Sequence, residues 1–126
     1  MTGVETRIRA LLIADTDVSA LVSTRVWPVQ ARQAAQLPFL VVHRVSGGKV
    51  NSLSGYSGLE YPRVQIDCYA STFDGTRTLA SKVRVAMDGA TTFSALCDDD
   101  VTTWEEASGI WRTILDFTCG NEEGTT

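Results

Sequence analysis

The stretch PFLVVHRVSGGKVNSLSGYSGLEYPRVQIDCYA, residues 38–70, decides the fold of this chain. Its end, Arg63–Ala70, alternates apolar and polar residues, which is typical of a strand with one buried face. Its start, Phe39–Val45, is mostly apolar and predicts a second strand. Between them, Ser46–Glu60 is rich in Gly, Ser and Asn, so we expect an extended loop. Loops of this length in compact domains are usually functional or disordered.

Upstream of this stretch, an apolar stripe at helical spacing predicts an N-terminal helix over Val4–Leu12. Asp15 and Asp17 interrupt the stripe, and either carboxylate is suited to cap a short second helical turn. Arg25–Pro28 then predicts a short edge strand, because proline cannot donate a hydrogen bond to a central ladder.

Downstream, a second apolar stripe at helical spacing predicts the other main helix, over Phe73–Met87. Ser71, Thr72 and Asp74 are the candidate N-caps of this helix. Gly89 follows its last turn, where we expect a C-cap in the left-handed conformation.

A second hairpin closes the chain, and its predicted strands are Leu96–Glu105 and Ile110–Cys119. One register places Glu105 opposite Arg112, and a turn one residue earlier places Trp104 opposite Trp111. An exposed ion pair contributes about 0.2–1 kcal/mol, and an aromatic pair about 0.5–1.5 kcal/mol beyond its burial. These ranges overlap, so the sequence leaves both registers open.

These elements predict an α+β fold: an antiparallel sheet of four or five strands, with two main helices packed on one face. The long loop joins two central strands of that sheet. We expect one domain over residues 1–126, with an extended loop at 46–60 and a flexible tail at 120–126.

The overall composition argues against several functional classes, although a local basic patch stays possible. The chain has 11 basic and 15 acidic residues and a net charge of −4, which does not favour a free-standing nucleic-acid binder. No apolar run approaches the roughly 20 residues that cross a bilayer, and the N-terminus does not resemble a signal peptide. The three cysteines are odd in number and widely spaced, so we expect synthesis in a reducing cytoplasm and no disulfide framework.

The residues that usually carry chemistry do not combine into a catalytic or metal site. His43 is the single histidine and lies in an apolar strand, so we interpret it as a core or rim residue. Asp98–Asp100 lacks the glycine and the spacing of a calcium loop, and we interpret it as a solvated strand entry. Asp67 and Asp116 are interpreted as ladder partners or subunit contacts. We therefore predict no enzymatic activity, no cofactor and no metal.

The loop offers the strongest candidate for an interaction surface. Gly47–Lys49 lacks the spacing of a phosphate-binding loop, so its glycines are interpreted as backbone freedom at a strand end. Several apolar residues of the loop cannot all fold back on a core, which indicates a surface that awaits a partner. The alternative is a loop packed on its own domain. The predicted contact residues are Lys49, Asn51, Leu53, Tyr56 and Leu59.

With these residues in view, the chain resembles a known family, the tail-completion or tail-terminator proteins of long-tailed phages, prophages and gene transfer agents. The resemblance includes LLIADTDVSALVSTRVWP, then LPFLVVHRVSGG, and the closing strand ILDF. Its most specific part is RVSGGKVNSLSGYSGLEYPRVQIDCYA.

The resemblance implies a structural virion protein at the tail end of the neck, synthesised in the cytoplasm of a bacterial host. It implies a ring, generally a hexamer, that caps the tail tube and offers a joining surface to the head connector or stopper protein. DNA passes through such a ring without specific binding, and neither a membrane nor a cofactor is involved. A head-side head–tail joining protein remains an alternative, and so does a small non-catalytic α+β ligand-binding module.

Overall fold

The computed structural model describes residues 4–28, 36–46, 49–52, 55–60, 63–90 and 94–120. Its helices are α1 (Val4–Ala14), α2 (Thr16–Val22) and α3 (Phe73–Asp88). Its strands are β1 (Val26–Pro28), β2 (Phe39–Ser46), β3 (Lys49–Ser52), β4 (Gly55–Glu60), β5 (Arg63–Ala70), β6 (Ser94–Glu105) and β7 (Ile110–Gly120).

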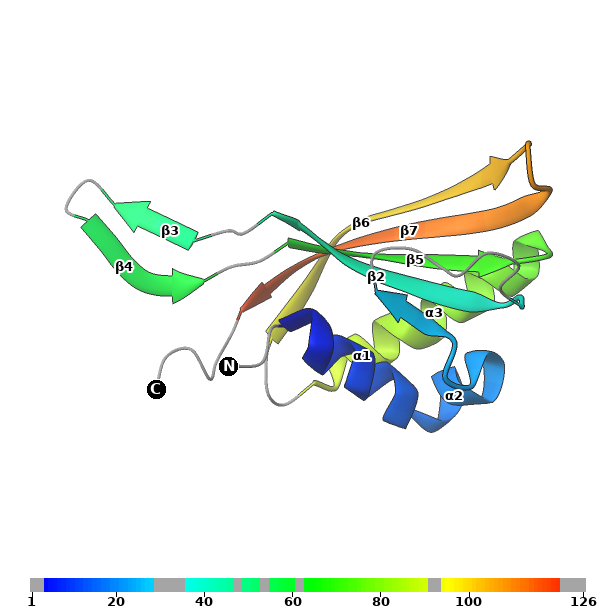
Figure 1. Ribbon diagram of the computed structural model, residues 1–126, viewed down its shortest axis with the longest axis horizontal. Coiled ribbons are helices and arrows are strands. Elements are labelled where there is room, and N and C mark those ends of the chain that lie inside the picture. Colours follow the sequence, from blue (N-terminus) through cyan, green and yellow to red (C-terminus); the bar gives the residue numbers. More distant parts are fainter. Residues whose placement is uncertain are drawn as a thin grey trace.

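The body of the molecule has two layers, with all three helices below one open sheet in the view of Figure 1. The sheet has five strands in the order β1-β2-β5-β7-β6. The predicted α+β class, the two main helices α1 and α3, and the strands of both hairpins are confirmed. The short helix α2 follows the predicted interruption at Asp15.

The sheet is mixed rather than purely antiparallel, because β1 runs parallel to β2. Val26 pairs with Leu40 and Pro28 with Val42, and the other neighbours in the sheet pair antiparallel. β1 is the edge strand that its proline predicts. The parallel direction of β1 was not predictable. The side-chain pattern of three residues indicates a strand, but it does not indicate whether that strand runs parallel or antiparallel to its neighbour.

The predicted buried face of β5 packs against the helices. Val64, Ile66 and Cys68 are fully buried there, and Ala70 is nearly so. The helices contribute fully buried residues to the same core, including Ile8, Leu12, Leu79 and Val83. The alternation along β5 therefore identifies the face of the sheet that the helix layer covers.

One buried hydroxyl fixes α3 on the sheet. Thr76 Oγ1 donates to the Cys68 carbonyl at 2.6 Å and lies 3.0 Å from the Thr113 hydroxyl. Both threonines are fully buried, so these polar atoms bond inside the core rather than to solvent. This contact positions the first turns of α3 over β5 and β7.

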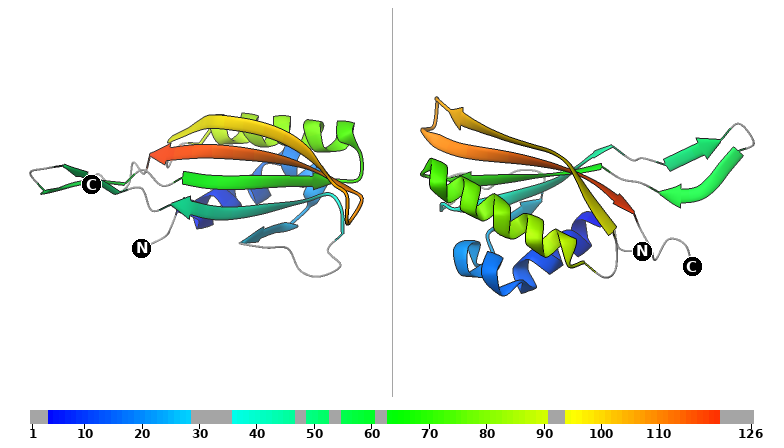
Figure 2. Two further views of the ribbon diagram at one scale, coloured as in Figure 1. Left: turned by 90° about the horizontal axis from the view of Figure 1, so that it is seen from above. Right: turned by 180° about the vertical axis from the view of Figure 1, so that it is seen from behind.

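The chain between the central strands β2 and β5 is long, as predicted, and it contains two short strands. β3 and β4 pair antiparallel, with Asn51 opposite Tyr56 and Ser52 opposite Gly55. Figures 1 and 2 show this hairpin standing clear of the five-stranded sheet, beyond the ends of β2 and β5. Gly, Ser and Asn have low strand propensity, so this pairing was not predictable from the residues of the segment.

The structure selects among the candidate helix caps. Asp15 caps α2, since its Oδ1 accepts from the backbone N–H groups of Asp17 and Val18, each at 3.0 Å. Thr72 caps α3, since its Oγ1 accepts from the Gly75 N–H at 2.9 Å. The prediction for Gly89 is wrong: its φ of −86° and ψ of 3° are not left-handed, because α3 ends in a right-handed turn.

The closing hairpin adopts the aromatic register. Trp104 is opposite Trp111, with ring centroids 5.0 Å apart. The ion pair still forms across the diagonal, with Arg112 Nη1 3.0 Å from Glu105 Oε1. Gly109, at φ +68°, completes the turn in the left-handed region that favours glycine. The two interactions between which the sequence could not decide are thus both present.

The cap assignment of α3 gives a stability prediction. We expect Thr72→Ala to lower the free energy of unfolding by about 1 kcal/mol, because it leaves a first-turn N–H without its acceptor. The matched control is Ser71→Ala, an exposed neighbour, which should change it by less than about 0.5 kcal/mol. Urea unfolding followed by circular dichroism measures both, and equal losses would contradict the assignment.

Candidate functional site

The β3–β4 hairpin carries most of the residues predicted to make contacts. Lys49 and Asn51 lie on β3, and Tyr56 and Leu59 lie on β4. The register brings Asn51 and Tyr56 opposite each other. Leu53 lies outside the described residues. The structure therefore places these four positions on one projecting element.

The hairpin forms a two-stranded sheet of its own among the described strands. Two strands that pair only with each other are marginally stable in water, and they gain stability by packing against another layer. The five-stranded sheet ends before the hairpin begins, and Figure 2 shows the two separated in both views. This arrangement fits an element that contacts a partner.

The face of the sheet away from the helices has a charged centre at Asp67. This carboxylate is 2% exposed. Its Oδ2 accepts from Arg112 Nη2 at 2.8 Å, and its Oδ1 accepts from Gln65 Nε2 at 2.8 Å. His43 Nε2 lies 3.5 Å from Oδ2, beside this network. Asp67, which was predicted to be a ladder partner or a subunit contact, thus pairs with Arg112 on the neighbouring strand β7.

Arg112 connects this centre to its surroundings. Burial opposes the charge of its guanidinium, but Asp67, Tyr69 and Glu105 together outweigh burial, and the net effect raises the pKa of Arg112. Its guanidinium also lies 5.6 Å from the centroid of the Tyr69 ring. These partners fix the side chain in place, so the cluster is a structural ion pair at the centre of the sheet.

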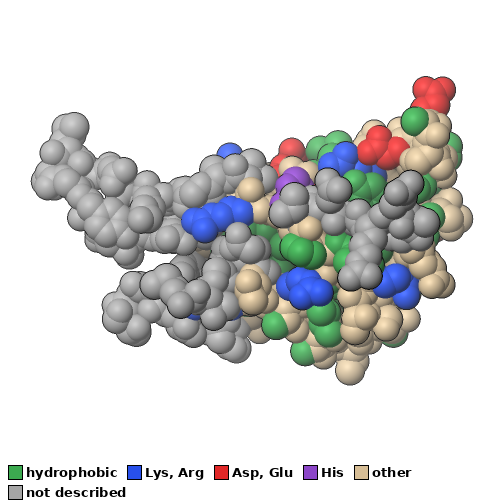
Figure 3. Space-filling model, in the orientation of Figure 1, with side chains coloured by type: hydrophobic (Ala, Val, Ile, Leu, Met, Phe, Trp, Pro, Cys, Tyr) green, Lys and Arg blue, Asp and Glu red, His purple; other side chains and the backbone are tan. Residues whose placement is uncertain are grey.

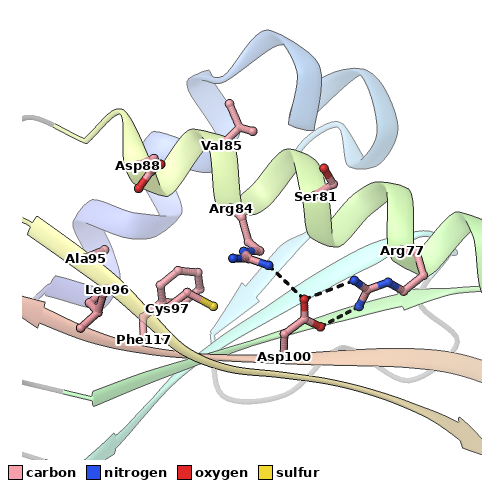
Figure 4. A pocket seen from close by; sticks show the side chains of 10 residues that line it. All are labelled: Arg77, Ser81, Arg84, Val85, Asp88, Ala95, Leu96, Cys97, Asp100 and Phe117. Atoms are coloured by element: carbon pink, nitrogen blue, oxygen red, sulfur yellow. Dashed lines mark hydrogen bonds and ion pairs between the residues drawn. The ribbon is translucent and has the colours of Figure 1, made fainter.

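A groove runs between α3 and β6 at the edge of the sheet, with a volume of about 470 Å³. Figure 4 shows Arg77 and Arg84 reaching from α3 toward Asp100 on β6. Arg77 makes two hydrogen bonds to the two carboxylate oxygens, at 2.6 and 3.3 Å, and Arg84 bonds one of them at 3.2 Å. Cys97 also lines the groove.

The role of Asp100 was not predicted from the sequence. Asp98 and Asp99 are exposed, as expected of a solvated strand entry, but Asp100 pairs with two arginines of α3. The available signal was the spacing of Arg77 and Arg84, which lie on one face of a helix seven residues apart. Pairing them with an acid on another element required the tertiary structure.

The groups that could carry covalent chemistry do not converge. Cys68 and Cys119 are buried, and burial raises the pKa of Cys119 to about 12, which keeps its thiol protonated. Burial also raises the pKa of Cys97. Among the described residues, no group of His, Cys, Asp and Glu could hold a metal ion. None of the described helices is long and apolar enough to span a membrane.

Comparison with known proteins gives a family and a fold. The family model "Tail completion protein gp17" matches residues 6–117. Among solved structures, a chain from the "Virion of native gene transfer agent (GTA) particle" superimposes with a TM-score of 0.73 at 16% sequence identity. The match covers 93% of this chain and 92% of that chain. No curated protein matches the sequence.

The buried ion pair gives the second prediction. We expect Arg112→Met to lower the free energy of unfolding by about 3 kcal/mol, because it leaves the Asp67 charge buried without its main partner. The matched control is Arg84→Met, whose side chain is 51% exposed. The control should cost less than about 1 kcal/mol, as exposed ion pairs do. Similar losses of unfolding free energy for the two variants in denaturant unfolding would show that the Asp67–Arg112 ion pair is not a structural centre.

Proposed function

Because the chain belongs to the tail completion protein gp17 family and is a structural protein of phage-type tails, we propose that it caps the tail tube as a ring and joins it to the head connector. The observation that carries this proposal is the family match over residues 6–117, which spans the helix layer and most of the sheet. The proposed position is the tail end of the neck of the virion.

The architecture fits a subunit that acts by shape. The two-layer body is a rigid wedge, and the β3–β4 hairpin projects from one end of it (Figure 1). Copies that associate head to tail form a closed ring when the rotation between them closes. We infer a hexamer in which DNA passes through the centre without specific binding, and we infer no catalytic role.

The hairpin supplies the contact that joins the wedge to its neighbours. In this proposal it reaches an adjacent subunit or the tube, and its residues Lys49, Asn51, Leu53, Tyr56 and Leu59 make the contact. A two-stranded element that is completed only in the assembly would restrict association to the end of the tube. Its position beyond β2 and β5 supports this role.

Tail length and head attachment test the proposed function directly. We expect lysates lacking this gene to contain overlong tails and unattached, DNA-filled heads, because nothing ends the tube or joins it. Negative-stain microscopy measures both features, and the complemented strain is the control. Tails of normal length with unattached heads would assign the protein to the head side of the joint instead. Intact particles would overturn the virion role and favour the ligand-binding module.

The contact residues have a test of their own. We expect Leu53→Ser/Tyr56→Ser to leave the thermal unfolding midpoint unchanged and to prevent particle assembly, because the substitutions remove apolar contact area from the hairpin. The matched control is Leu53→Ile/Tyr56→Phe, which keeps that area and should assemble. Normal particles from the serine variant would show that the hairpin is not an interface.

A further inference from the structure

The exposed apolar surface of the described residues gathers on two elements. Their large hydrophobic side chains with substantial exposure are Phe73, Val85, Leu96, Val101 and Trp104. All of them belong to α3 or β6. Val85 and Leu96 are each 66% exposed and line the groove between these elements, where Figure 4 shows them on opposite walls. Such a concentration at one edge of a sheet marks an interaction surface.

The two edges of the sheet differ in how they are protected. β6 is twelve residues long, and among the described strands it pairs only with β7, so its outer backbone groups form an open edge. β1, at the other edge, has three residues and ends in Pro28. There Arg9 Nε donates to the Val26 carbonyl at 2.6 Å, which covers that backbone group. The two edges therefore differ in length and in protection, so a contact between one edge and the other would be heterologous.

Strand β6 and the side of the molecule that carries β1 present side chains of opposite charge. Asp98 and Asp99 are exposed on β6, beside the exposed Leu96. At the opposite edge, Arg9 and Arg25 bond to backbone carbonyls, which leave their positive charge in place. Figure 3 shows Lys and Arg side chains over the helix layer on the face that carries β1, while both basic and acidic side chains lie toward the upper margin of this face.

We propose that in the ring the α3–β6 edge of one copy binds the α1–β1 edge of the next, with Asp98 and Asp99 facing Arg9 and Arg25. This inference rests on the proposed function, since a ring must present both halves of its interface on every chain. The occupant of the groove is thus a second copy of this chain. Val85 and Leu96 contribute exposed apolar area to this contact, and the charge pairs beside them fix the register.

Charge reversal tests this pairing in cells that lack the gene. We expect Asp98→Arg/Asp99→Arg alone, and Arg9→Glu/Arg25→Glu alone, each to reduce finished particles about a hundredfold, because like charges then face each other across the interface. A chain carrying all four substitutions should restore particles, because both edges are reversed together. Restoration also shows that the substituted chains fold.

Three outcomes would overturn the pairing. Normal particles from a chain with only one edge reversed would overturn it. So would a lack of particles from the chain with all four substitutions, if the thermal unfolding midpoint of that chain is normal. If that chain does not fold, cross-linking decides: Thr6→Cys, beside Arg9 on α1, should cross-link to the natural Cys97 of the next copy in finished particles. The control Ala20→Cys on α2 should not cross-link, and a Thr6→Cys chain that fails to cross-link contradicts the proposal.

The deletion strain separates this inference from the proposed function. If deletion of the gene leaves particles intact, the proposed ring itself is wrong.

Discussion

The structure depends on the two-sided pairing of β5. This strand is held by β2 on one side and by β7 on the other, and its alternate side chains enter the core below. A slip of one residue in either ladder would bring Asp67 into the helix-covered face and expose Ile66. The ion pair between Asp67 and Arg112 adds a polar constraint on the opposite face. Both faces of β5 therefore demand the same register.

That fixed centre determines where the two proposed interaction surfaces lie. The β3–β4 hairpin leaves the sheet between β2 and β5, so two interior strands carry the projecting element. α3 is fixed by Thr76, and its far side forms one wall of the groove beside β6. A rigid centre with a projecting hairpin and an open edge is well suited to an assembly in which each copy positions the next.

The sequence predicted the elements whose pattern is local and long. The alternation of β5 and the apolar stripe of α3 each specify a face, because every residue in the repeat contributes to the same burial. The sequence did not decide between alternatives of similar local energy, namely the candidate caps of α3 and the two registers of the closing hairpin. Thr72 and its neighbours all have capping side chains, and two registers of the closing hairpin each had a favourable pair.

Features that depend on distant contacts were missed for a different reason. The pairing of Asp100 with the arginines of α3 and the parallel direction of β1 both require knowing which elements lie side by side. The same holds for the candidate contact surfaces. Composition predicted a partner for the segment at 46–60, but only the topology shows that the open edge β6 and the covered edge β1 lie on opposite sides of the sheet.

Cryo-electron microscopy of the neck of intact particles tests the central claim, that this chain is a ring subunit at the end of the tail tube. We expect a closed ring of this fold there, with each β3–β4 hairpin lying on a neighbouring subunit or on the tube. A neck without this fold, or a ring in which every hairpin folds back on its own sheet, would contradict the account.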